Sequence, residues 1–237
     1  AKNVIKFMRG TQPGVLFECF SGNDSLISIS EHGSEVFVPF PGIYSAENAL
    51  LTLAVCNKLG IPVDFAIKQI SKLRIPGRFE SVTLKSKPNS LFVIDYAHNG
   101  ASLEAVLKAL REYEPRRIIC LFGSVGGRTF GRRRELGIAA RNFADVSIIT
   151  SDNLDTEDPL NVINDILKEF ENSDKPVYSI TDRKKAIEKA VEIAEDGDFV
   201  LLSGKGHESY QLISGRRVPF SEKDILEKTD IKNLTYV

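Results

Sequence analysis

The amino-acid sequence predicts an α/β protein whose C-terminal part contains a mostly parallel β-sheet. Short runs that are apolar throughout alternate with longer stretches that have helical spacing. These runs are Leu91–Ile94, Ile118–Phe122, Val146–Thr150 and Phe199–Leu202. Such runs, unlike alternating ones, are typical of parallel strands that helices cover on both faces. The residues that precede them follow a different pattern, so we expect two domains.

The first domain is expected to contain hairpins and helices. Alternating runs at 15–20, 26–29 and 35–38 are separated by turn residues, a pattern typical of antiparallel hairpins. Residues 46–59 are apolar on nearly every side and predict a buried helix, and residues 63–73 predict a second, shorter one. Ile75-Pro76-Gly77 interrupts this pattern. We therefore place the domains at 1–75 and 76–237.

The second domain is expected to alternate strands with helices. Residues 103–110 and 162–170 carry apolar side chains at helical spacing, and Asp158-Pro159 supplies an N-cap and a proline suited to a helix start. Ligands of open parallel sheets bind beyond the carboxyl ends of the strands. The functional residues are therefore expected at that edge.

Composition narrows the classes of function. The net charge of the 237 residues is −1, which gives no overall field toward nucleic acid or a membrane surface. No apolar run approaches the ~20 residues of a membrane helix, and the N-terminus does not resemble a signal peptide. The three cysteines are scattered in apolar runs without metal-ligand spacing and are expected to be reduced core residues. We expect a cytoplasmic protein with no membrane insertion and no nucleic-acid partner.

Polar residues follow each predicted strand of the second domain. They are Asp95–Asn99, Gly123–Arg128, Thr150–Asn153 and Ser203–Glu208. Because parallel strands end at one edge of a sheet, these groups should converge there.

Each group also has a simpler interpretation. Asp95 could cap the next helix, His98 could be a packing residue, and the glycines at 123–127 could form only a tight turn. Arg132–Arg134 could be a solvated helix face, or could bind nucleic acid, although Phe130 is the one aromatic residue nearby. Asp152-Asn153 could form only an Asx turn.

Taken in order, these strings resemble the Mur ligases of peptidoglycan synthesis, most closely the MurE type, which adds the third amino acid to UDP-N-acetylmuramoyl-L-alanyl-D-glutamate. The strings are "GIYSAEN" at 42–48, "IPGRFE" at 75–80, "DYAH" at 95–98, "FGSVGGR" at 122–128, "TSDN" at 150–153, "EDP" at 157–159, "DR" at 182–183 and "GKGHESYQ" at 204–211.

This resemblance implies that 1–75 is the end of a central P-loop-type ATPase domain and that 76–237 is a Rossmann-like, amino-acid-binding C-terminal domain. The chain contains no G-x-x-x-x-G-K-[ST] motif. The phosphate-binding loop, the catalytic residues and the magnesium ligands are therefore expected upstream, and this chain is expected to be a fragment that is inactive alone.

The family's chemistry uses ATP and Mg²⁺. ATP activates the D-glutamate γ-carboxylate as an acyl phosphate, which the amine of the incoming amino acid attacks. The implied partners are a uridine-nucleotide-linked dipeptide, ATP and a free amino acid, and the implied enzyme is a bacterial cytoplasmic monomer.

The resemblance also implies roles for individual residues. Asn48 matches an asparagine that contacts adenine, Arg78 and Asp95 match residues that reach the nucleotide, and His98 lies beside them. Arg128 matches the arginine that grips the amino acid's carboxylate, which suits a guanidinium fork. Gly204 and Glu208 match positions that hold the far end of the amino acid.

The chain departs from the family pattern at Asp155. Asp152-Asn153-Leu154-Asp155 stands where diaminopimelate-adding members carry Asp-Asn-Pro-Arg, whose arginine pairs with the distal carboxylate. An aspartate would repel that carboxylate and favour an ammonium. We therefore expect L-lysine or a related diamino acid, with meso-diaminopimelate as the alternative; Asp155 could also simply face solvent.

Two other classes remain open. One is a different amide ligase of the wider family, such as a cyanophycin or folylpolyglutamate synthetase relative. The other is a non-catalytic amino-acid-binding module, against which the pattern of residues 1–75 argues.

Overall fold

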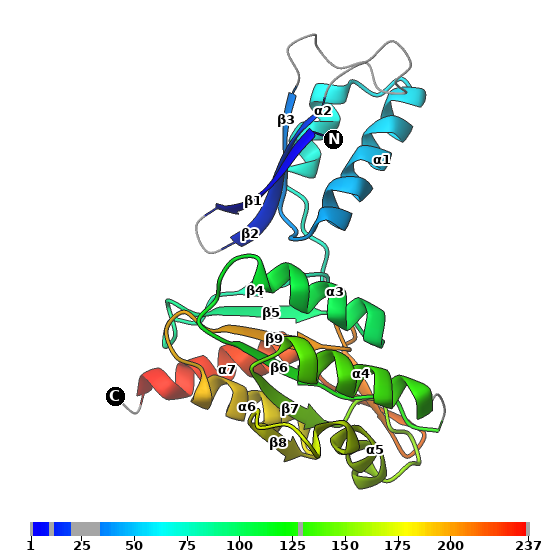
Figure 1. Cartoon of the computed structure of the whole chain (residues 1–237), viewed down its shortest axis with the longest axis vertical. Coiled ribbons are helices and arrows are strands. Elements are labelled where there is room, and N and C mark those ends of the chain that lie inside the picture. The colour runs from blue at the N-terminus through cyan, green and yellow to red at the C-terminus, as the bar shows by residue number, and fades with distance from the viewer. Residues whose placement is uncertain (1, 10–11, 20–33, 128–129, 236–237) are drawn as a thin grey trace. The chain divides into compact units, whose positions relative to one another are not determined.

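The computed structural model describes residues 2–9, 12–19, 34–127 and 130–235 (Figure 1). The chain divides into two compact units, residues 1–74 and 75–237, which are described separately.

The first unit combines an antiparallel sheet with two helices. Its strands β1 (Lys2–Arg9), β2 (Gln12–Cys19) and β3 (Ser34–Val38) pair in that order. The helices are α1 (Ile43–Lys58) and α2 (Val63–Ile70). The runs predicted at 15–20 and 35–38 thus belong to β2 and β3, whereas the run at 26–29 lies outside the described residues. Strand β1 was not anticipated.

Helix α1 corrects one prediction. Its face with Ala46, Ala49 and Leu53 packs into the core of this unit, but Leu51 and Val55 remain 66% and 51% exposed. The prediction that the helix is buried on all sides is therefore wrong for the described residues. Apolar composition alone could not separate a helix buried all round from one with an exposed apolar face.

The second unit is built on a six-stranded sheet of order β4-β5-β9-β6-β7-β8. All neighbouring strands are parallel except the short edge strand β4, which is antiparallel to β5. The strands are β4 (Glu80–Val82), β5 (Leu91–Asp95), β6 (Ile118–Phe122), β7 (Val146–Thr150), β8 (Val177–Ile180) and β9 (Phe199–Ser203). The predicted α/β class with a mostly parallel sheet is confirmed.

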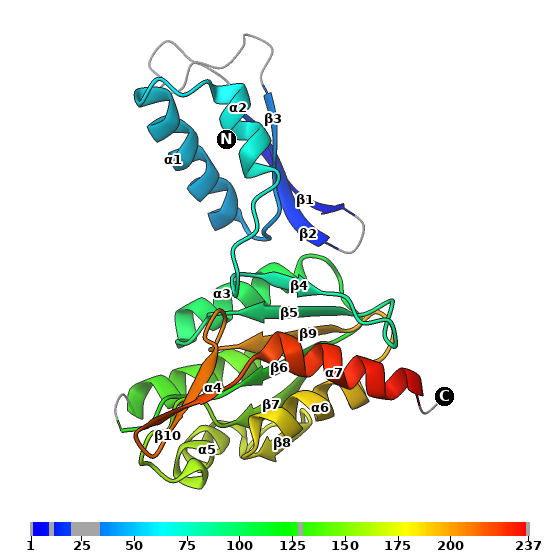
Figure 2. The ribbon, with the colours of Figure 1, turned by 180° about the vertical axis from the view of Figure 1, so that it is seen from behind.

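Helices cover both faces of this sheet. Figure 1 shows α3 (Gly100–Arg111), α4 (Phe130–Phe143) and α5 (Pro159–Leu167) on one face, and the 3₁₀ turn η1 (Lys168–Phe170) continues α5. Figure 2 shows α6 (Arg183–Ile193) and α7 (Glu222–Thr235) on the other. A separate hairpin, β10 (Tyr210–Ile213) with β11 (Arg216–Pro219), follows β9.

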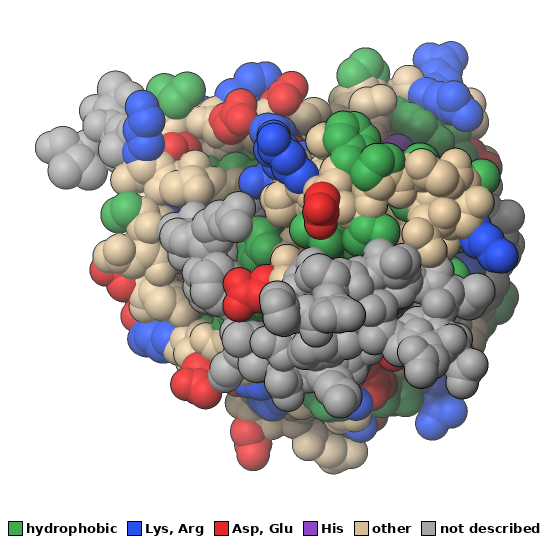
Figure 3. All heavy atoms as spheres, turned by 90° about the horizontal axis from the view of Figure 1, so that it is seen from above, with side chains coloured by type: hydrophobic (Ala, Val, Ile, Leu, Met, Phe, Trp, Pro, Cys, Tyr) green, Lys and Arg blue, Asp and Glu red, His purple; other side chains and the backbone are tan. Residues whose placement is uncertain are grey.

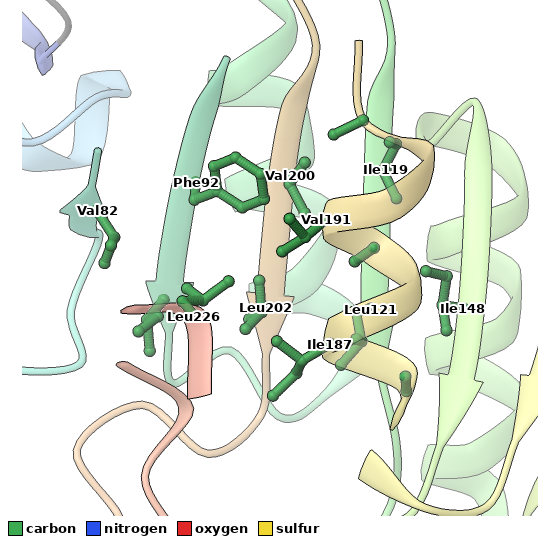
Figure 4. Close-up of a cluster of buried hydrophobic side chains, with 14 of the residues drawn as sticks. Val82, Phe92, Ile119, Leu121, Ile148, Ile187, Val191, Val200, Leu202 and Leu226 are labelled. Carbon is green, nitrogen blue, oxygen red and sulfur yellow. The ribbon is translucent and has the colours of Figure 1, made fainter. Parts of the chain in front are cut away.

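The core between the sheet and α6 and α7 is apolar throughout (Figure 4). Phe92, Val200 and Leu202 project from β5 and β9 toward Ile187 and Val191 of α6. These side chains and Ile94 of the same cluster are at most 2% exposed. Nearly all of their apolar surface is therefore removed from water. Burial of this kind stabilises a fold by about 25 cal/mol per Å².

Short polar residues begin three of the helices. Asn99 accepts from the amide of Ser102 and forms a capping box at α3. Asp158 accepts from Leu160 N, with Pro159 in the first turn of α5, as predicted. Asp182 caps α6 in the same way. Because these caps satisfy otherwise unpaired amides, they fix where each loop at the carboxyl edge of the sheet ends.

In the parts of the chain that the structure describes, no helix combines the length and apolarity that crossing a bilayer requires. On the face shown in Figure 3, basic, acidic and hydrophobic side chains are intermingled among the described atoms.

Candidate functional site at the carboxyl edge of the sheet

The ends of β5, β7 and β9 are connected to one another by hydrogen bonds. Gly204 N donates to the carbonyl of Asp95 at 3.0 Å. Arg183 donates to the carbonyls of Ser151 and Ser203 at 3.2 and 2.8 Å. The structure therefore brings the predicted residues of these three strand ends together.

Asp95 is a buried anchor for two backbone segments. Its Oδ2 accepts from Phe79 N and its Oδ1 from Ala97 N, both at 2.8 Å, and the residue is 8% exposed. Burial raises the pKa of the Asp95 carboxyl, although the two backbone hydrogen bonds and Arg78 act in the opposite direction. The alternative that Asp95 caps the next helix is wrong, because Asn99 does so.

The loop before β4 presents Arg78 next to Tyr96. Phe79 has a φ of 45°, and its amide is held by Asp95. The guanidinium of Arg78 lies 4.6 Å from the centre of the Tyr96 ring. His98 and His207 also contact this ring, with centroid distances of 4.8 and 5.2 Å. His98 Nδ1 lies 2.9 Å from the carbonyl of Tyr96. Tyr96 is thus the centre of an aromatic and cationic group that the sequence did not single out.

The loop at 75–79 and the turn at 204–208 are in backbone contact. A Cβ on Gly77 would lie 1.9 Å from His207 N, and a Cβ on Gly206 would lie 2.7 Å from Gly77 O and from Tyr96 Cβ. Both glycines also have positive φ, 65° and 52°. Neither position can accept a side chain without backbone movement.

Lys205 is the centre of a buried polar network. Its side chain is 0% exposed, and its Nζ lies 2.9 Å from Asn153 Oδ1, 2.9 Å from Glu208 Oε2 and 3.3 Å from Asp152 Oδ1. Asn153 Nδ2 also donates to Glu208 Oε2 at 2.8 Å. The segments after β7 and β9 are thereby joined. The turn interpretation of Asp152-Asn153 is incomplete, because both side chains bind across to the other segment.

Gly204 lies against this network. Its φ is 111°, and a Cβ at this position would lie 3.1 Å from Asp152 Oδ2. The absence of a side chain therefore leaves that carboxylate oxygen uncovered on this side.

Asp155 anchors the β10–β11 hairpin. Its Oδ1 accepts from Gly215 N at 2.7 Å, its carbonyl accepts from Ser214 N at 2.6 Å, and its amide donates to Leu212 O at 3.0 Å. The residue is exposed and has a φ of 54°, a conformation that aspartate tolerates better than most residues. Asp155 thus faces solvent, as one interpretation held, but one carboxylate oxygen is engaged with the hairpin turn.

Arg183 and Glu222 form a buried ion pair near the Lys205 network. The distance from Arg183 Nη2 to Glu222 Oε1 is 2.8 Å, and Asp152 and Lys205 both act electrostatically on Glu222. Arg183 lay within the string "DR", but Glu222 was not singled out from the sequence.

Arg128 lies outside the described residues, so its predicted contact with a carboxylate has no structural description. The preceding residue, Gly127, donates its amide to Glu157 Oε2 at 2.6 Å. Glu157 also pairs with Arg133 at 2.6 Å, and Arg133 pairs with Asp165 at 2.9 Å. Arg133 is 1% exposed. The interpretation of Arg132–Arg134 as a solvated face is therefore wrong for Arg133, which holds this loop.

Asn48 belongs to the first unit, on α1, and is exposed. It is therefore not one of the residues that the second unit brings together. Among the described residues, no three histidine, cysteine, aspartate or glutamate side chains form a group that could hold a metal ion. We assign no magnesium ligand to these residues.

The second unit is thus an α/β domain with its polar residues at the carboxyl edge of a mostly parallel sheet, the arrangement of ligand-binding domains of this class. Residues 77–206 match the family model described as "Mur ligase, glutamate ligase domain". The chain belongs to the Mur ligase family.

Two bacterial ligases are among the relatives of this chain. The chain is 35% identical over 208 residues to the UDP-N-acetylmuramoyl-L-alanyl-D-glutamate–2,6-diaminopimelate ligase of Caldanaerobacter subterraneus, covering 88% of this chain and 43% of the relative. It is 39% identical over 191 residues to the ligase of the same name from Coxiella burnetii, covering 80% and 38%. The chain therefore spans less than half the length of these relatives.

Solved structures show the same fold. A structure of a UDP-N-acetylmuramoyl-L-alanyl-D-glutamate–2,6-diaminopimelate ligase superimposes with a TM-score of 0.66 at 29% identity, over 95% of this chain and 43% of that one. The MurF ligase of Thermotoga maritima gives a TM-score of 0.61 at 19% identity, over 98% and 46%. At that identity the second likeness concerns the fold alone.

Proposed function

We propose that the protein to which this chain belongs is an ATP-dependent ligase that joins a diamino acid to UDP-N-acetylmuramoyl-L-alanyl-D-glutamate. The observation that carries this proposal is the Lys205 network, which unites Asp152, Asn153 and Glu208 at the carboxyl edge of the sheet. Family membership supports the ligase class, and the relatives' names support the nucleotide-linked dipeptide as acceptor.

On the nucleotide side, Asp95 and Arg78 act together. By family resemblance, ATP converts the D-glutamate γ-carboxylate into an acyl phosphate, a far better electrophile than a carboxylate. Asp95 fixes the amides of Phe79 and Ala97, and so holds the loop that carries Arg78. The exposed guanidinium is free to meet phosphate or acyl-phosphate charge, and His98 stands beside it across the Tyr96 ring. Asn48, from the first unit, is proposed to contact the adenine.

On the amino-acid side, the site has a surplus of negative charge. Two carboxylates, Asp152 and Glu208, share the single ammonium of Lys205. Glu208 Oε1 and Asp152 Oδ2 have no hydrogen-bond partner within the described part of the chain. A second ammonium, carried by the far end of a diamino acid, would satisfy both charge and hydrogen bonding. Arg128 is proposed to bind the carboxylate of the same molecule.

The preferred amino acid is proposed to be L-lysine or a close analogue such as ornithine. Asp155 still has Oδ2 available after Oδ1 binds Gly215 N, and it adds negative charge beside Asn153. A distal carboxylate would meet repulsion there. The second candidate is meso-diaminopimelate, which the names of the relatives in Caldanaerobacter and Coxiella favour.

Residues 1–74 are proposed to be the end of a central ATPase domain. Exposed apolar residues on α1, among them Ile43, Leu51 and Val55, suit a helix that packs against further structure. The phosphate-binding loop and the magnesium ligands are proposed to belong to that domain. On this basis the 237-residue chain alone would not turn over ATP. A cytoplasmic location and a monomeric state remain parts of the proposal.

The test is a ligation assay with the longer protein, ATP, Mg²⁺ and the uridine-linked dipeptide. Lysine, ornithine and meso-diaminopimelate are offered separately, and ADP release and the tripeptide product are measured. Product with lysine or ornithine supports the full proposal. Product with diaminopimelate alone keeps the ligase and removes the lysine assignment. No product with any of them would redirect the search to other amide ligases.

A further inference from the structure

Lys205 has no capacity left to bind a ligand. An ammonium carries three donors, and the structure gives Nζ three oxygen partners, on Asp152, Asn153 and Glu208. The side chain is 0% exposed. Its position in a glycine-rich turn therefore does not make it a phosphate-binding lysine. Its three hydrogen-bond partners are residues that we propose to face the amino acid, and its Nζ also lies 5.9 Å from the centre of the Tyr210 ring.

Burying an ammonium is unfavourable unless the surrounding groups compensate. Here the compensation comes from two separate segments, residues 152–153 after β7 and residue 208 after β9. Removing the ammonium would leave the Asp152 and Glu208 carboxylates close together without a counter-charge. Lys205 therefore offsets the repulsion between the carboxylates of the two segments, which Arg183 and the Asn153–Glu208 hydrogen bond also join.

The network also fixes which way each group points. Glu208 Oε2 accepts from both Lys205 and Asn153 Nδ2, and Asp152 Oδ1 accepts from both Lys205 and Asn153 N. Asn153 Oδ1 accepts from Lys205 and from Leu212 N at 3.0 Å, which defines the orientation of its amide. Each carboxylate thus has one anchored oxygen and one oxygen that no described residue binds.

We propose that Lys205 is a positioning residue that sets the amino-acid site of this ligase. It turns one oxygen of Glu208 and one of Asp152 toward the place where the ammonium of the incoming amino acid binds. This inference rests on the proposed function for the identity of the ligand. Lys205 itself makes no contact with the substrate; it acts through Glu208, Asp152 and Asn153.

The first measurement does not depend on activity. Amide hydrogen exchange is measured on the 237-residue chain and on Lys205→Met, with Lys189→Met as the matched control. Lys189 also pairs with a glutamate three residues later, Glu192, at 2.7 Å, but on the surface. The amides of Asn153 and Leu212, which donate to side chains of the network, should exchange at least tenfold faster in Lys205→Met and unchanged in Lys189→Met.

The second measurement separates positioning from a purely structural role. In the longer protein, Lys205→Met should raise KM for the amino acid at least tenfold and leave KM for ATP within twofold. Lys205→Arg keeps the charge but cannot reproduce three contacts from one nitrogen. Because it keeps the counter-charge, it should lower the melting temperature less than Lys205→Met does and still raise KM for the amino acid, so it provides the test if Lys205→Met does not fold.

Three results would overturn the inference: unchanged exchange of Asn153 and Leu212 in a folded Lys205→Met, faster exchange with an unchanged KM for the amino acid, or an unchanged KM in Lys205→Arg. If the wild-type longer protein ligates no amino acid, the proposed function fails. The inference for an amino-acid ligand fails with it, and the exchange rates still report whether Lys205 holds the two segments.

Discussion

Arg183 and Glu222 form an ion pair in which both side chains are buried. Arg183 Nη2 lies 2.8 Å from Glu222 Oε1, and the two side chains are 0% and 1% exposed. The same guanidinium binds the carbonyls of Ser151, which directly follows β7, and of Ser203, the last residue of β9. One buried contact therefore ties α6 and α7 to the edge of the sheet that carries the candidate site.

Removing one partner of this pair should be costly. Arg183→Met leaves the Glu222 carboxylate buried without its cation, and the free energy of unfolding should fall by about 3–5 kcal/mol in urea titrations. The double variant Arg183→Met/Glu222→Leu removes both charges and should recover much of that loss. Lys189→Met, which removes a pair on the surface, should leave the free energy of unfolding close to that of the wild type. Equal losses for the buried and exposed pairs would contradict this account.

Acid should weaken the opposite edge of the sheet through Asp198. This carboxylate is 0% exposed and pairs with Arg117 at 2.6 Å and with Arg116 at 3.2 Å, while Glu195 shares both arginines. Burial acts to raise the pKa of Asp198, but the bonds from Arg117 and from Glu195 N outweigh it and hold the pKa below its ordinary value.

A lowered carboxyl pKa contributes stability that is present above the unfolded pKa, near 4, and is lost as pH falls through the folded pKa. Asp198→Asn should therefore cost about 2–4 kcal/mol at pH 7, and this difference from wild type should shrink below about pH 4. Urea unfolding followed by circular dichroism at pH 7, 4 and 3 measures it. A difference that stays constant over this range would show that Asp198 does not titrate in this way.

The contact between the two loops predicts a steric cost at Gly206. An alanine there must adopt a φ of 52° and place its Cβ 2.7 Å from Gly77 O. Gly215→Ala is the matched control, because its φ of 74° is similar but no atom lies within 4 Å of the added carbon. The control should lose about 1 kcal/mol from the left-handed conformation, and Gly206→Ala about 1–3 kcal/mol more. Equal melting temperatures would mean that the loops separate freely.

The central strands of the parallel sheet could be predicted because strands that are buried on both faces consist mainly of apolar residues. β5, β6 and β7 are buried at every position, and their runs were recognised by continuous apolarity. The edge strands β4 and β8 have only three or four residues, and some of their positions are partly exposed. They therefore do not form a continuous apolar run that could be recognised in the sequence. Helix α4 was anticipated only as a possible helix face at Arg132–Arg134, since its buried side consists of Leu136, two alanines, a glycine and one arginine.

The site could be predicted as a set of strand ends but not as a network. The residues Asp95, Asp152, Asn153, Gly204 and Glu208 were recognised by position, whereas the burial of Lys205 was not. A lysine in a glycine-rich turn is usually exposed, and its three partners come from positions 3 to 53 residues away. The pairing of Arg133 with Glu157 and Asp165 depends likewise on how α4 and α5 pack.

Asp155 anchors the hairpin, and one substitution can separate this contact from the proposed effect of its charge on the choice of amino acid. Asp155→Asn keeps an acceptor oxygen for Gly215 N and a residue type that tolerates a φ of 54°, but it removes the negative charge. The melting temperature of the 237-residue chain should therefore stay close to wild type. In the longer protein, KM for lysine should rise about fivefold to tenfold, which corresponds to about 1 kcal/mol, and discrimination against meso-diaminopimelate should weaken.

Asp155→Ala is the comparison for this last prediction, because it removes both the charge and the acceptor. It should lower the melting temperature as well, since the hairpin turn loses its side-chain anchor at Gly215 and alanine is disfavoured at positive φ. Steady-state kinetics with both amino acids measure the charge effect, and thermal unfolding measures the anchor. If Asp155→Asn keeps the wild-type preference between the two amino acids, Asp155 serves the hairpin alone, and the choice of substrate must be made by other residues.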